Sequence, residues 1–429
     1  TEIYTLSLHD ALPIYILEFL RNLYFEKSEY LRAFDLKKEE RTIQHQFGYI
    51  AFVGAARLKP KLQIINPPLE PVRAANMARE ITASGREQDV DRLIQRIQST
   101  QHKLTIIYGP SGVGKSSIVA AGLVPELEQK TIGARQVVPV LLKVYRDWTR
   151  ELDRQLTLTN KLLNYKTNKR RKTKSFQGQN SENKAEFIAQ NNPSFSYSIY
   201  SRFNLTNTPN SADLPPKENP DCEVNIRCEA AGEERGQILE KLRKNSENNR
   251  FTVLIFDQFE EFFFFCKETT KTKEFFSFLR ECLNINFVKV VICLRDDYLH
   301  KLLDCNRLSN RETINNDLLE NILSKDNLFY LGNFSPKQAY QVIDSLTKRS
   351  HFYLQPTLIE ELVKDLAGDL GEVRPIELQV VGAQLQADKI ATLSKYKQLG
   401  EKPKQTLVER FLKQVVKDCG PENERTAQK

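Results

Sequence analysis

The stretch GPSGVGKSS at residues 109–117 constrains the fold more than any other part of this chain. It satisfies the pattern G-x-x-x-x-G-K-[ST], and it lies between the β-rich run LTIIY at 104–108 and the apolar run SSIVAAGLV at 116–124. A strand, a glycine-rich turn and a helix in this order are typical of a loop that wraps a phosphate group. The sequence therefore predicts an α/β domain with a phosphate site.

The residue types of this loop fit a bound triphosphate. Glycines let backbone N–H groups turn toward phosphate oxygens, and the following helix presents its positive end to the same anion. We expect the Lys115 ammonium to reach the β- and γ-phosphates and the Ser116 hydroxyl to take a Mg²⁺ ligand position. A glycine-rich turn without a ligand is the alternative. The predicted binding residues of the loop are Gly109, Pro110, Ser111, Gly112, Val113, Gly114, Lys115, Ser116 and Ser117.

A second informative stretch is FTVLIFDQFEEFFFF at residues 251–265. In phosphate-loop sites an acid at the end of another parallel strand holds Mg²⁺, usually through water, and Asp257 ends the buried-strand run FTVLIF. Glu260 has two interpretations of equal weight: it orients a water toward the γ-phosphate, or it forms a capping box with Asp257. Because Gln258 follows Asp257 directly, we expect slow hydrolysis. We expect the phenylalanines at 262–265 to be helix core.

Arg295 follows the fourth β-rich run, FVKVVICL at 287–294, and precedes two aspartates. An arginine at the carboxyl end of a parallel strand lies on the ligand edge of the sheet, where it can contact a γ-phosphate. We therefore predict a catalytic role for Arg295, beside Lys115, Asp257 and Glu260. The alternative is an arginine that pairs with the neighbouring aspartates.

The β-rich runs at 104–108, 137–145, 251–256 and 287–294 are separated by helix-like segments. Strands joined in this way form parallel sheets with right-handed crossovers. Beyond Arg295 the chain has mostly helical periodicity. The predicted fold class is therefore α/β, with a parallel-sheet core followed by an all-helical domain.

Three segments fall outside this pattern. Residues 1–14, TEIYTLSLHDALPI, resemble the conceptual translation of a sequencing-adapter oligonucleotide, so we expect them to be foreign to the fold. Residues 15–80 predict a helical extension and a proline-rich linker, whose role the sequence does not indicate. Residues 155–225 are rich in Asn, Lys and Ser and poor in large aliphatic residues, which predicts a disordered or loosely ordered insertion.

Composition limits the class of protein and its partners. The formal net charge of +8 is mostly local, because six basic residues lie in one run and the rest of the chain is nearly neutral. The seven cysteines include no C-x-x-C pair, and no apolar segment reaches the roughly 20 residues that span a bilayer. We therefore expect a cytoplasmic protein without a membrane partner. The basic run consists of Lys166, Lys169, Arg170, Arg171, Lys172 and Lys174.

Several of these motifs together resemble a known family. GREQDVDRLIQRI, GPSGVGKSSIVAAGLVPEL, LIFDQFEEFF, VVICLRDDYLHKLL and GEVRPIELQVVGAQL resemble the STAND class of signalling P-loop NTPases, in the novel-STAND branch common in bacteria and of the cyanobacterial type. The resemblance covers roughly residues 81–425 apart from the insertion. DQFEE and the AGL-x-PEL segment separate it from generic AAA+ proteins.

The resemblance implies an ATP/ADP switch that opens, exchanges nucleotide, self-associates and brings effector domains together. It also implies a P-loop NTPase domain at 81–310, a helical domain at 311–402, and the start of a winged-helix domain at 403–429. Gly109 to Ser117 would be the Walker A motif, Asp257 the Walker B acid and Arg295 the sensor arginine. Pro375 would lie on the adenine side, and Arg86 would belong to the segment that lines the base pocket. Effector and sensor domains are expected beyond both ends of this sequence.

Two other functions compete with this one. The first is a DNA-handling AAA+ or initiator-like ATPase, in which the basic run contacts phosphates. We disfavour it, because ordering a loose segment costs about 1–2 kcal/mol per residue, and we expect no nucleic-acid partner. The second is a GTPase, disfavoured because no N-K-x-D base-reading segment occurs.

Overall fold

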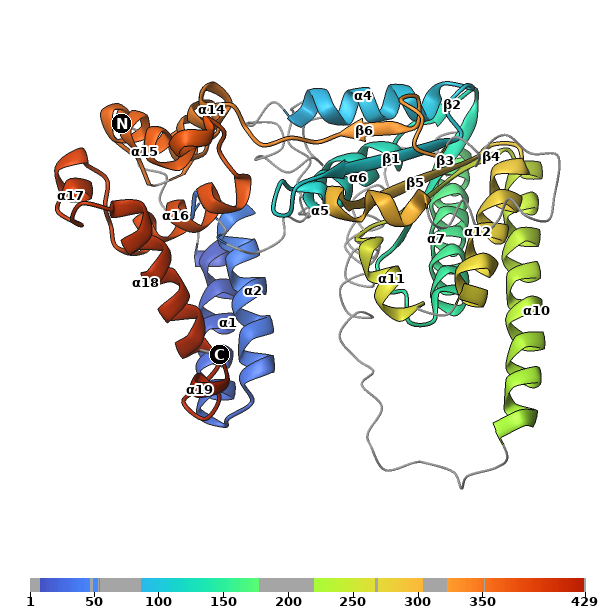
Figure 1. Ribbon diagram of the computed structural model, residues 1–429, viewed down its shortest axis with the longest axis horizontal. Helices are drawn as coiled ribbons and strands as arrows, with labels where there is room; N and C mark the ends of the chain where they lie inside the picture. Colours follow the sequence, from blue (N-terminus) through green and yellow to red (C-terminus); the bar gives the residue numbers. More distant parts are fainter. Residues whose placement is uncertain are drawn as a thin grey trace.

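The computed structural model describes residues 8–46, 49–52, 54, 86–176, 220–266, 269–303, 322–350 and 352–427. Figure 1 shows an α/β part built on a central sheet and a helical part beside it. The α/β part carries the phosphate-loop motif, and the helical part follows strand β6. The predicted fold class, an α/β P-loop core followed by a helical region, is confirmed.

Within the described residues the sheet has six strands in the order β2-β3-β4-β5-β1-β6. All neighbouring pairs are parallel except β2 with β3. The register pairs Gly109 with Arg295 and Leu142 with Phe256, so the carboxyl ends of β1, β3, β4 and β5 reach one edge together. The strands are β1 (Leu104–Gly109), β2 (Thr131–Ile132), β3 (Arg135–Leu142), β4 (Arg250–Phe256), β5 (Val288–Arg295) and β6 (Leu328–Tyr330).

Alternate residues of the strands enter two separate cores, because successive side chains of a strand point to opposite faces. Ile106, Leu254 and Ile292 belong to one core, whereas Ile107 and Ile255 belong to the other. Both faces are covered by helices, which explains the nearly continuous apolar runs of the strands. The two cores place α4 (Arg86–Gln98), α5 (Lys115–Ile118) and α6 (Val124–Leu127) on one face. They place α7 (Trp148–Phe176), α10 (Pro220–Glu247), α11 (Glu260–Phe265) and α12 (Thr269–Asn284) on the other.

The helix after the phosphate loop contains a π-helical turn at Val119–Leu123, between α5 and α6. The Val124 N–H bonds to the Val119 carbonyl five residues earlier. Pro125 has no N–H and would clash with the carbonyl four residues before it in a regular α-helix. The wider turn accommodates this proline, which explains a local irregularity that the motif pattern does not predict.

The prediction of a disordered insertion over residues 155–225 is wrong at both of its ends. Helix α7 continues to Phe176 and α10 begins at Pro220. Leu156 and Leu163 are buried in the core on that face, and a few well-spaced leucines are enough to hold a long amphipathic helix there. The middle of the predicted insertion, at 177–219, lies outside the described residues.

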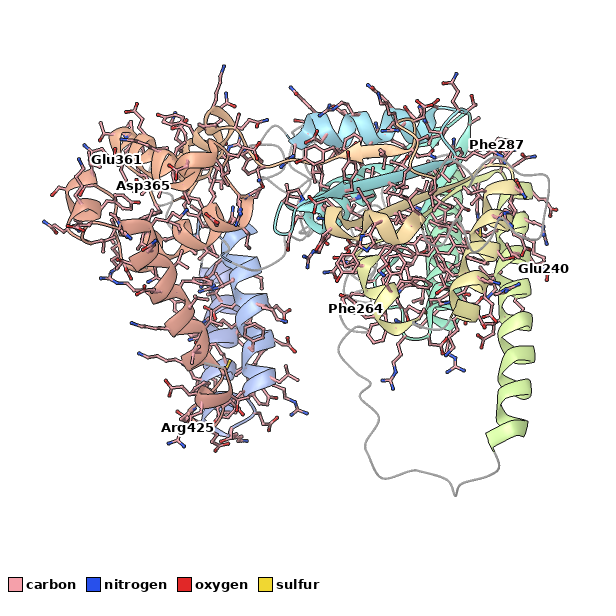
Figure 2. All side chains as sticks on the ribbon, viewed as in Figure 1. Glu240, Phe264, Phe287, Glu361, Asp365 and Arg425 are labelled. Carbon is pink, nitrogen blue, oxygen red and sulfur yellow. The ribbon has the colours of Figure 1, made fainter. Side chains whose placement is uncertain are left out.

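The phenylalanine run is only partly core. Phe262 is fully buried in a cluster with Phe259 and Phe275, whereas Phe264 and Phe265 are 54% and 53% exposed. Figure 2 shows Phe264 on the outside of the α/β part, beside α11. A helix turns about 100° per residue, so four consecutive side chains cannot all face the sheet. The prediction that all four form the core is therefore wrong.

The helical part has one core of its own. It begins with α14 (Pro336–Lys348), whose N-cap Ser335 forms a capping box with Gln338, and Leu407 of the late helix α18 belongs to the same core. The residues at 403–427 therefore pack with the helical region, and a winged-helix domain that starts there stays a prediction. The remaining helices are α15 (Pro356–Ala367), α16 (Pro375–Ala387), α17 (Leu393–Lys397), α18 (Pro403–Asp418) and α19 (Glu424–Ala427).

The N-terminal helices form a hairpin beside this helical part (Figure 1). Helix α1 (Leu8–Glu26) packs against α2 (Tyr30–Gln46). Helix α1 begins inside the segment expected to be foreign, and the structure marks no boundary at residue 14. None of the helices in the described part of the chain is long and apolar enough to cross a bilayer.

Candidate functional site

The phosphate loop adopts a conformation that its glycines allow. Gly112 has φ +78° and Gly114 has φ +96°, in the region that L side chains rarely enter. At Gly109 the constraint is space, because a Cβ atom would lie 2.1 Å from the Leu331 carbonyl oxygen. The helix of α5 begins at Lys115, directly after the loop. The loop thus has the strand, turn and helix order that the motif predicts.

Lys115 lies over the loop and is held by its backbone. The Nζ atom donates to the carbonyl oxygens of Gly109 at 2.6 Å and of Pro110 at 2.8 Å. Burial lowers the pKa of Lys115 from its ordinary value, while the nearby carboxylates of Glu260 and Asp296 act in the opposite direction. An ammonium group that faces acids across a glycine-lined loop is suited to bind the phosphates of a nucleotide.

Ser116 and Asp257 meet, although 141 positions of sequence separate them. The Ser116 Oγ donates to Asp257 Oδ1 at 2.8 Å, and Asp257 is fully buried. The second carboxylate oxygen, Oδ2, has no hydrogen-bond partner, and its nearest described cation is Lys143 Nζ at 3.9 Å. A buried carboxylate oxygen without a donor, next to a hydroxyl, fits a hydrated Mg²⁺ ion.

The metal donor set is small. Among the described residues no group of three or more His, Cys, Asp and Glu side chains is placed to hold a metal. Mg²⁺ keeps several waters and is bound by one or two protein oxygens together with substrate phosphates, and Ser116 and Asp257 supply oxygens of this kind.

Glu260 faces the phosphate loop and does not form the capping box. It is the first residue of α11, whose N-cap is Phe259 without a side-chain cap, so the capping interpretation is wrong. Asp257 instead uses its carboxylate toward Ser116. Burial raises the pKa of Glu260, and the Lys115 ammonium and the main-chain N–H groups of Glu260 and Arg295 oppose that rise. Its Oε2 atom is buried without a hydrogen-bond partner.

Arg295 ends β5 on the same edge but pairs locally. Its Nε and NH2 donate to the two carboxylate oxygens of Asp297 at 3.0 and 2.6 Å, and its guanidinium lies 5.6 Å from the ring centre of Tyr298. The structure therefore shows the alternative interpretation of Arg295, a pair with a neighbouring aspartate. A phosphate-sensing role stays a prediction.

Arg86 and Pro375 occupy different surroundings. Arg86 is nearly buried, donates to Asp89 and to the Gly332 carbonyl, and stacks 4.7 Å from the ring centre of Phe334. It thus fastens the start of α4 to the segment after β6. Pro375 is the first residue of α16, and a Cβ atom on Gly112 would lie 2.6 Å from Cγ2 of Ile376, the next residue. The structure therefore brings Pro375 beside the phosphate loop.

Comparison with protein families decides the relationship. A sequence model described as Novel STAND NTPase 1 matches residues 82–429, which is most of the chain. The chain belongs to the novel STAND NTPase family. This confirms the resemblance found in the motifs, and it makes the protein a P-loop NTPase. A sequence search of curated proteins found no match.

The solved structures similar to this STAND NTPase have low sequence identity to it. The Walker-type ATPase PABY2304 of Pyrococcus abyssi is 14% identical, with 80% of this chain and 75% of that chain covered and a TM-score of 0.42. The Aeropyrum pernix ORC2 protein, solved as ADPNP–ADP complexes, is 11% identical over 82% and 71% of the chains, with a TM-score of 0.38. The Aeropyrum pernix ORC1 protein in complex with DNA is 12% identical over 82% and 69%, also at 0.38.

Two residues of the STAND NTPase site are absent from the sequence prediction. Lys143 places its ammonium near Asp257 Oδ2, and the Tyr145 hydroxyl donates to the Asp257 carbonyl at 2.7 Å. Both follow β3, in the segment VVPVLLKVY that predicts a strand. Because β3 lies parallel to β4, residues after β3 reach the edge that carries Asp257. A cation and a buried tyrosine directly after a parallel strand were the available signal.

The backbone around Asp257 is tightly constrained. Gln258 has φ +56°, which is uncommon for a residue with a side chain. The Phe259 N–H donates to the Cys293 carbonyl of β5 at 2.8 Å, and the Tyr145 ring packs edge-on against Phe259. These contacts hold the turn between Asp257 and Glu260, so that both carboxylates face the phosphate loop.

Proposed function

We propose that this STAND NTPase is an ATP/ADP switch: it binds ATP with Mg²⁺, hydrolyses it slowly, and self-associates according to the nucleotide state. The observation that carries the proposal is the 2.8 Å contact between Ser116 Oγ and Asp257 Oδ1. It joins the phosphate loop to the end of a different strand at one point, as the Mg²⁺-dependent binding of a triphosphate requires.

In this proposal Ser116 and Asp257 would hold Mg²⁺, Asp257 through water. Bound Mg²⁺ would neutralise charge on the β- and γ-phosphate oxygens. Lys115 would leave the carbonyls of Gly109 and Pro110 to bind the same phosphates, which offer it charged acceptors in place of neutral ones.

Glu260 is proposed to orient the attacking water. It is the acid that faces Lys115 from the first turn of α11, and its carboxylate must be ionised to accept a proton. Gln258 occupies the position directly after Asp257, and its amide cannot act as a base there. Because the proposed base lies three residues after Asp257 and not directly after it, we expect slow hydrolysis and long nucleotide retention.

The helical part is proposed to report the nucleotide state. Ile376 of α16 packs on Gly112 in the phosphate loop, so a change in the loop acts directly on that helix. The switch would recruit effector domains when copies of the chain associate. A cytoplasmic location is supported by the buried free thiols of Cys266, Cys282 and Cys293.

Equilibrium binding and turnover test this proposal. ATP and ADP are expected to bind more tightly than GTP, and Mg²⁺ is expected to tighten ATP binding. Single-turnover hydrolysis should be slow, and light scattering should show larger particles with a non-hydrolysable ATP analogue than with ADP. Equal affinity for GTP and ATP would contradict the choice of nucleotide, and a single particle size in both states would contradict the switch.

One observation favours the DNA-handling alternative. The basic run Lys166–Lys174 was disfavoured as a DNA contact because it was expected to be disordered, but it lies within helix α7. A preformed helix lowers the ordering cost of binding. Filter binding of duplex DNA across a salt series tests it, and sub-micromolar binding at physiological salt would favour this second function.

A further inference from the structure

The segment Tyr49–Gly54 is built into the helical part although it lies outside the family match. We call Tyr49, Ile50, Ala51, Phe52 and Gly54 the strap. Ala51 and Phe52 are almost fully buried in the core formed by α14 to α18, and the family match begins at residue 82. The helical core of this protein is thus completed by residues that precede the family match in sequence.

The groove that receives the strap is shaped for an aromatic side chain. A Cβ atom on Gly382 of α16 would lie 2.5 Å from the ring of Phe52, so the ring rests on bare helix backbone. Glycine inside a helix costs roughly 0.5–1 kcal/mol relative to alanine, and the close approach of Phe52 explains its presence. On the other side, a Cβ atom on Gly54 would lie 3.1 Å from the ring of Phe411 in α18.

The groove also binds the main chain of the strap. The Ala51 N–H donates to Gln386 Oε1 at 2.9 Å, and Gln386 Nε2 donates to the Tyr49 carbonyl at 3.3 Å. One side-chain amide therefore satisfies both a donor and an acceptor of the same short peptide. A buried aromatic anchor combined with main-chain hydrogen bonds is the chemistry of peptide recognition.

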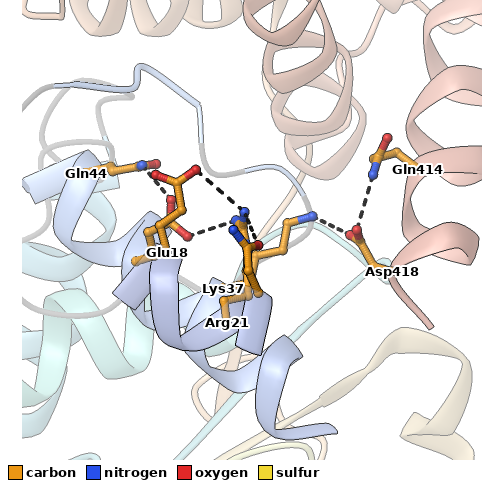
Figure 3. A network of polar contacts seen from close by, with 8 residues as sticks. Glu18, Arg21, Lys37, Gln44, Gln414 and Asp418 are labelled. Carbon is orange, nitrogen blue, oxygen red and sulfur yellow. Dashed lines mark hydrogen bonds and ion pairs between the residues drawn. The ribbon is translucent and has the colours of Figure 1, made fainter. Parts of the chain in front are cut away.

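The α1–α2 hairpin, which precedes the strap in sequence, is joined to α18 by an ion pair. Lys37 of α2 pairs with Asp418 at the end of α18, and Gln414 donates to the same carboxylate at 3.2 Å (Figure 3). A Cβ atom on Gly420 would lie 2.4 Å from the ring of Tyr30, so the hairpin also lies close to the turn that follows α18. These contacts keep the strap at a high local concentration beside its groove.

Helix α16 links the groove to the phosphate loop. Ile376, its second residue, packs on Gly112, and Gly382 and Gln386 in its C-terminal half hold the strap. The helix spans Pro375–Ala387 without a break, so a continuous hydrogen-bonded segment connects the two contacts. If binding at one end of α16 shifts the helix, binding at the other end responds, because such coupling is reciprocal.

We propose that the groove between α16 and α18 is a peptide-binding site whose resident ligand is the strap, and that release of the strap loosens nucleotide binding. The coupling rests on the proposed nucleotide function, whereas the peptide site does not. The class of ligand is a short peptide with a small residue, an aromatic residue and a glycine, as in YIAFVG at 49–54.

The peptide site is tested first, without nucleotide. A fluorescent YIAFVG peptide is added to the wild-type chain and to its Phe52→Ala variant. The variant is expected to bind the peptide, because its own strap has lost its anchor, and the wild type at least about tenfold more weakly because the groove is filled. A peptide with alanine in place of phenylalanine is the ligand control. Equal binding by both proteins, or binding by neither, would overturn the peptide site.

The coupling is tested by the dissociation rate of ADP. Phe52→Ala and Gly382→Ala perturb one contact from opposite sides, and each is expected to accelerate ADP release at least about fivefold. The double change Gly382→Ala with Phe52→Leu makes room for the new methyl group and should restore a rate near that of the wild type. Leu31→Ala, on the exposed face of the hairpin, is the matched control with no expected effect.

The outcomes separate the two proposals. If Phe52→Ala and Gly382→Ala release ADP at the wild-type rate, the coupling is wrong even where the peptide binds. If the wild type does not bind ADP, the proposed nucleotide function fails, while the peptide experiment still decides the groove. Circular dichroism melting checks that the variants are folded, and Phe52→Leu replaces Phe52→Ala in both experiments if the alanine variant does not fold.

Discussion

Each end of the central sheet carries a lysine that is at least half-buried, and the two lysines make nearly the same bonds. At the carboxyl edge, Lys115 donates to the carbonyls of Gly109 and Pro110. Near the amino end of β5, Lys289 donates to the carbonyls of Ser99 and His102, each at 2.6 Å. Burial lowers the pKa of both ammonium groups. Hydrogen bonding and burial alone therefore do not distinguish a functional lysine from a structural one.

The difference lies in what else faces each lysine. Lys115 faces the carboxylates of Glu260 and Asp296 across a glycine-lined loop. The charged group that affects the pKa of Lys289 is Lys103, whose positive charge lowers it. The Lys103 ammonium donates to the Leu283 carbonyl at 3.0 Å. Lys289 therefore ties the end of α4 to the sheet, whereas Lys115 belongs to a set of opposite charges that a phosphate and a metal can enter. Site-directed changes at both edges test this comparison.

The largest effect is expected for Lys115→Ala. The variant loses charge-assisted contacts to the phosphates, each worth roughly 1.5–3 kcal/mol, so ATP affinity should fall on the order of 1,000-fold. Isothermal titration with ATP and Mg²⁺ measures it. Lys289→Met is the matched control at the other buried lysine and should leave ATP affinity unchanged. Wild-type affinity in Lys115→Ala would remove the assignment of the phosphate site.

The next effect is expected for Glu260→Gln, which keeps the shape of the side chain but removes the base. General-base catalysis contributes about 10²- to 10⁴-fold, so single-turnover hydrolysis should slow about 100-fold while ATP affinity changes little. Because burial raises the pKa of Glu260, wild-type hydrolysis should fall at low pH from a higher pH than an ordinary carboxyl group would give. Unchanged hydrolysis in Glu260→Gln would show that another group orients the water.

A smaller effect is expected for Asp257→Asn. The amide keeps an oxygen for the Ser116 hydroxyl but removes the negative charge that attracts Mg²⁺. The Mg²⁺ concentration that gives half-maximal ATP binding should rise about tenfold, while ATP binding without Mg²⁺ should not weaken. A Mg²⁺ titration at fixed ATP measures this. An identical Mg²⁺ dependence in variant and wild type would place the metal elsewhere.

The features that the sequence predicts are those fixed by local sequence pattern or by the order of the strands. The phosphate loop and the strand-end aspartate were predicted, because their residue types must occur at fixed positions relative to a strand. The meeting of Ser116 with Asp257 followed from parallel strands that end at one edge. Features set by local pattern and sheet topology were thus within reach of the sequence.

The sequence did not predict features in which a side chain has more than one possible partner. Arg295 had Asp297 and a phosphate as alternative partners, and only the structure shows the pair with Asp297. The order of helix α7 beyond residue 155 depends on a few leucines against one sheet face. The strap depends on a glycine in a distant helix, Gly382, whose periodic context gives no sign of the aromatic ring that covers it.

The smallest effect concerns the structural lysine and depends on pH. Burial lowers the pKa of Lys289 to about 8, against 10.5 for an ordinary lysine. The unfolded chain therefore holds this proton in the range where the folded chain loses it, so stability rises with pH between the two values. From pH 7 to pH 9 the free energy of unfolding of the wild type should gain about 1.4 kcal/mol relative to Lys289→Met. Urea unfolding of both proteins at the two pH values measures the gain. If the difference in the free energy of unfolding between them is the same at both pH values, Lys289 keeps its proton. The two lysines would then differ more than their bonding indicates.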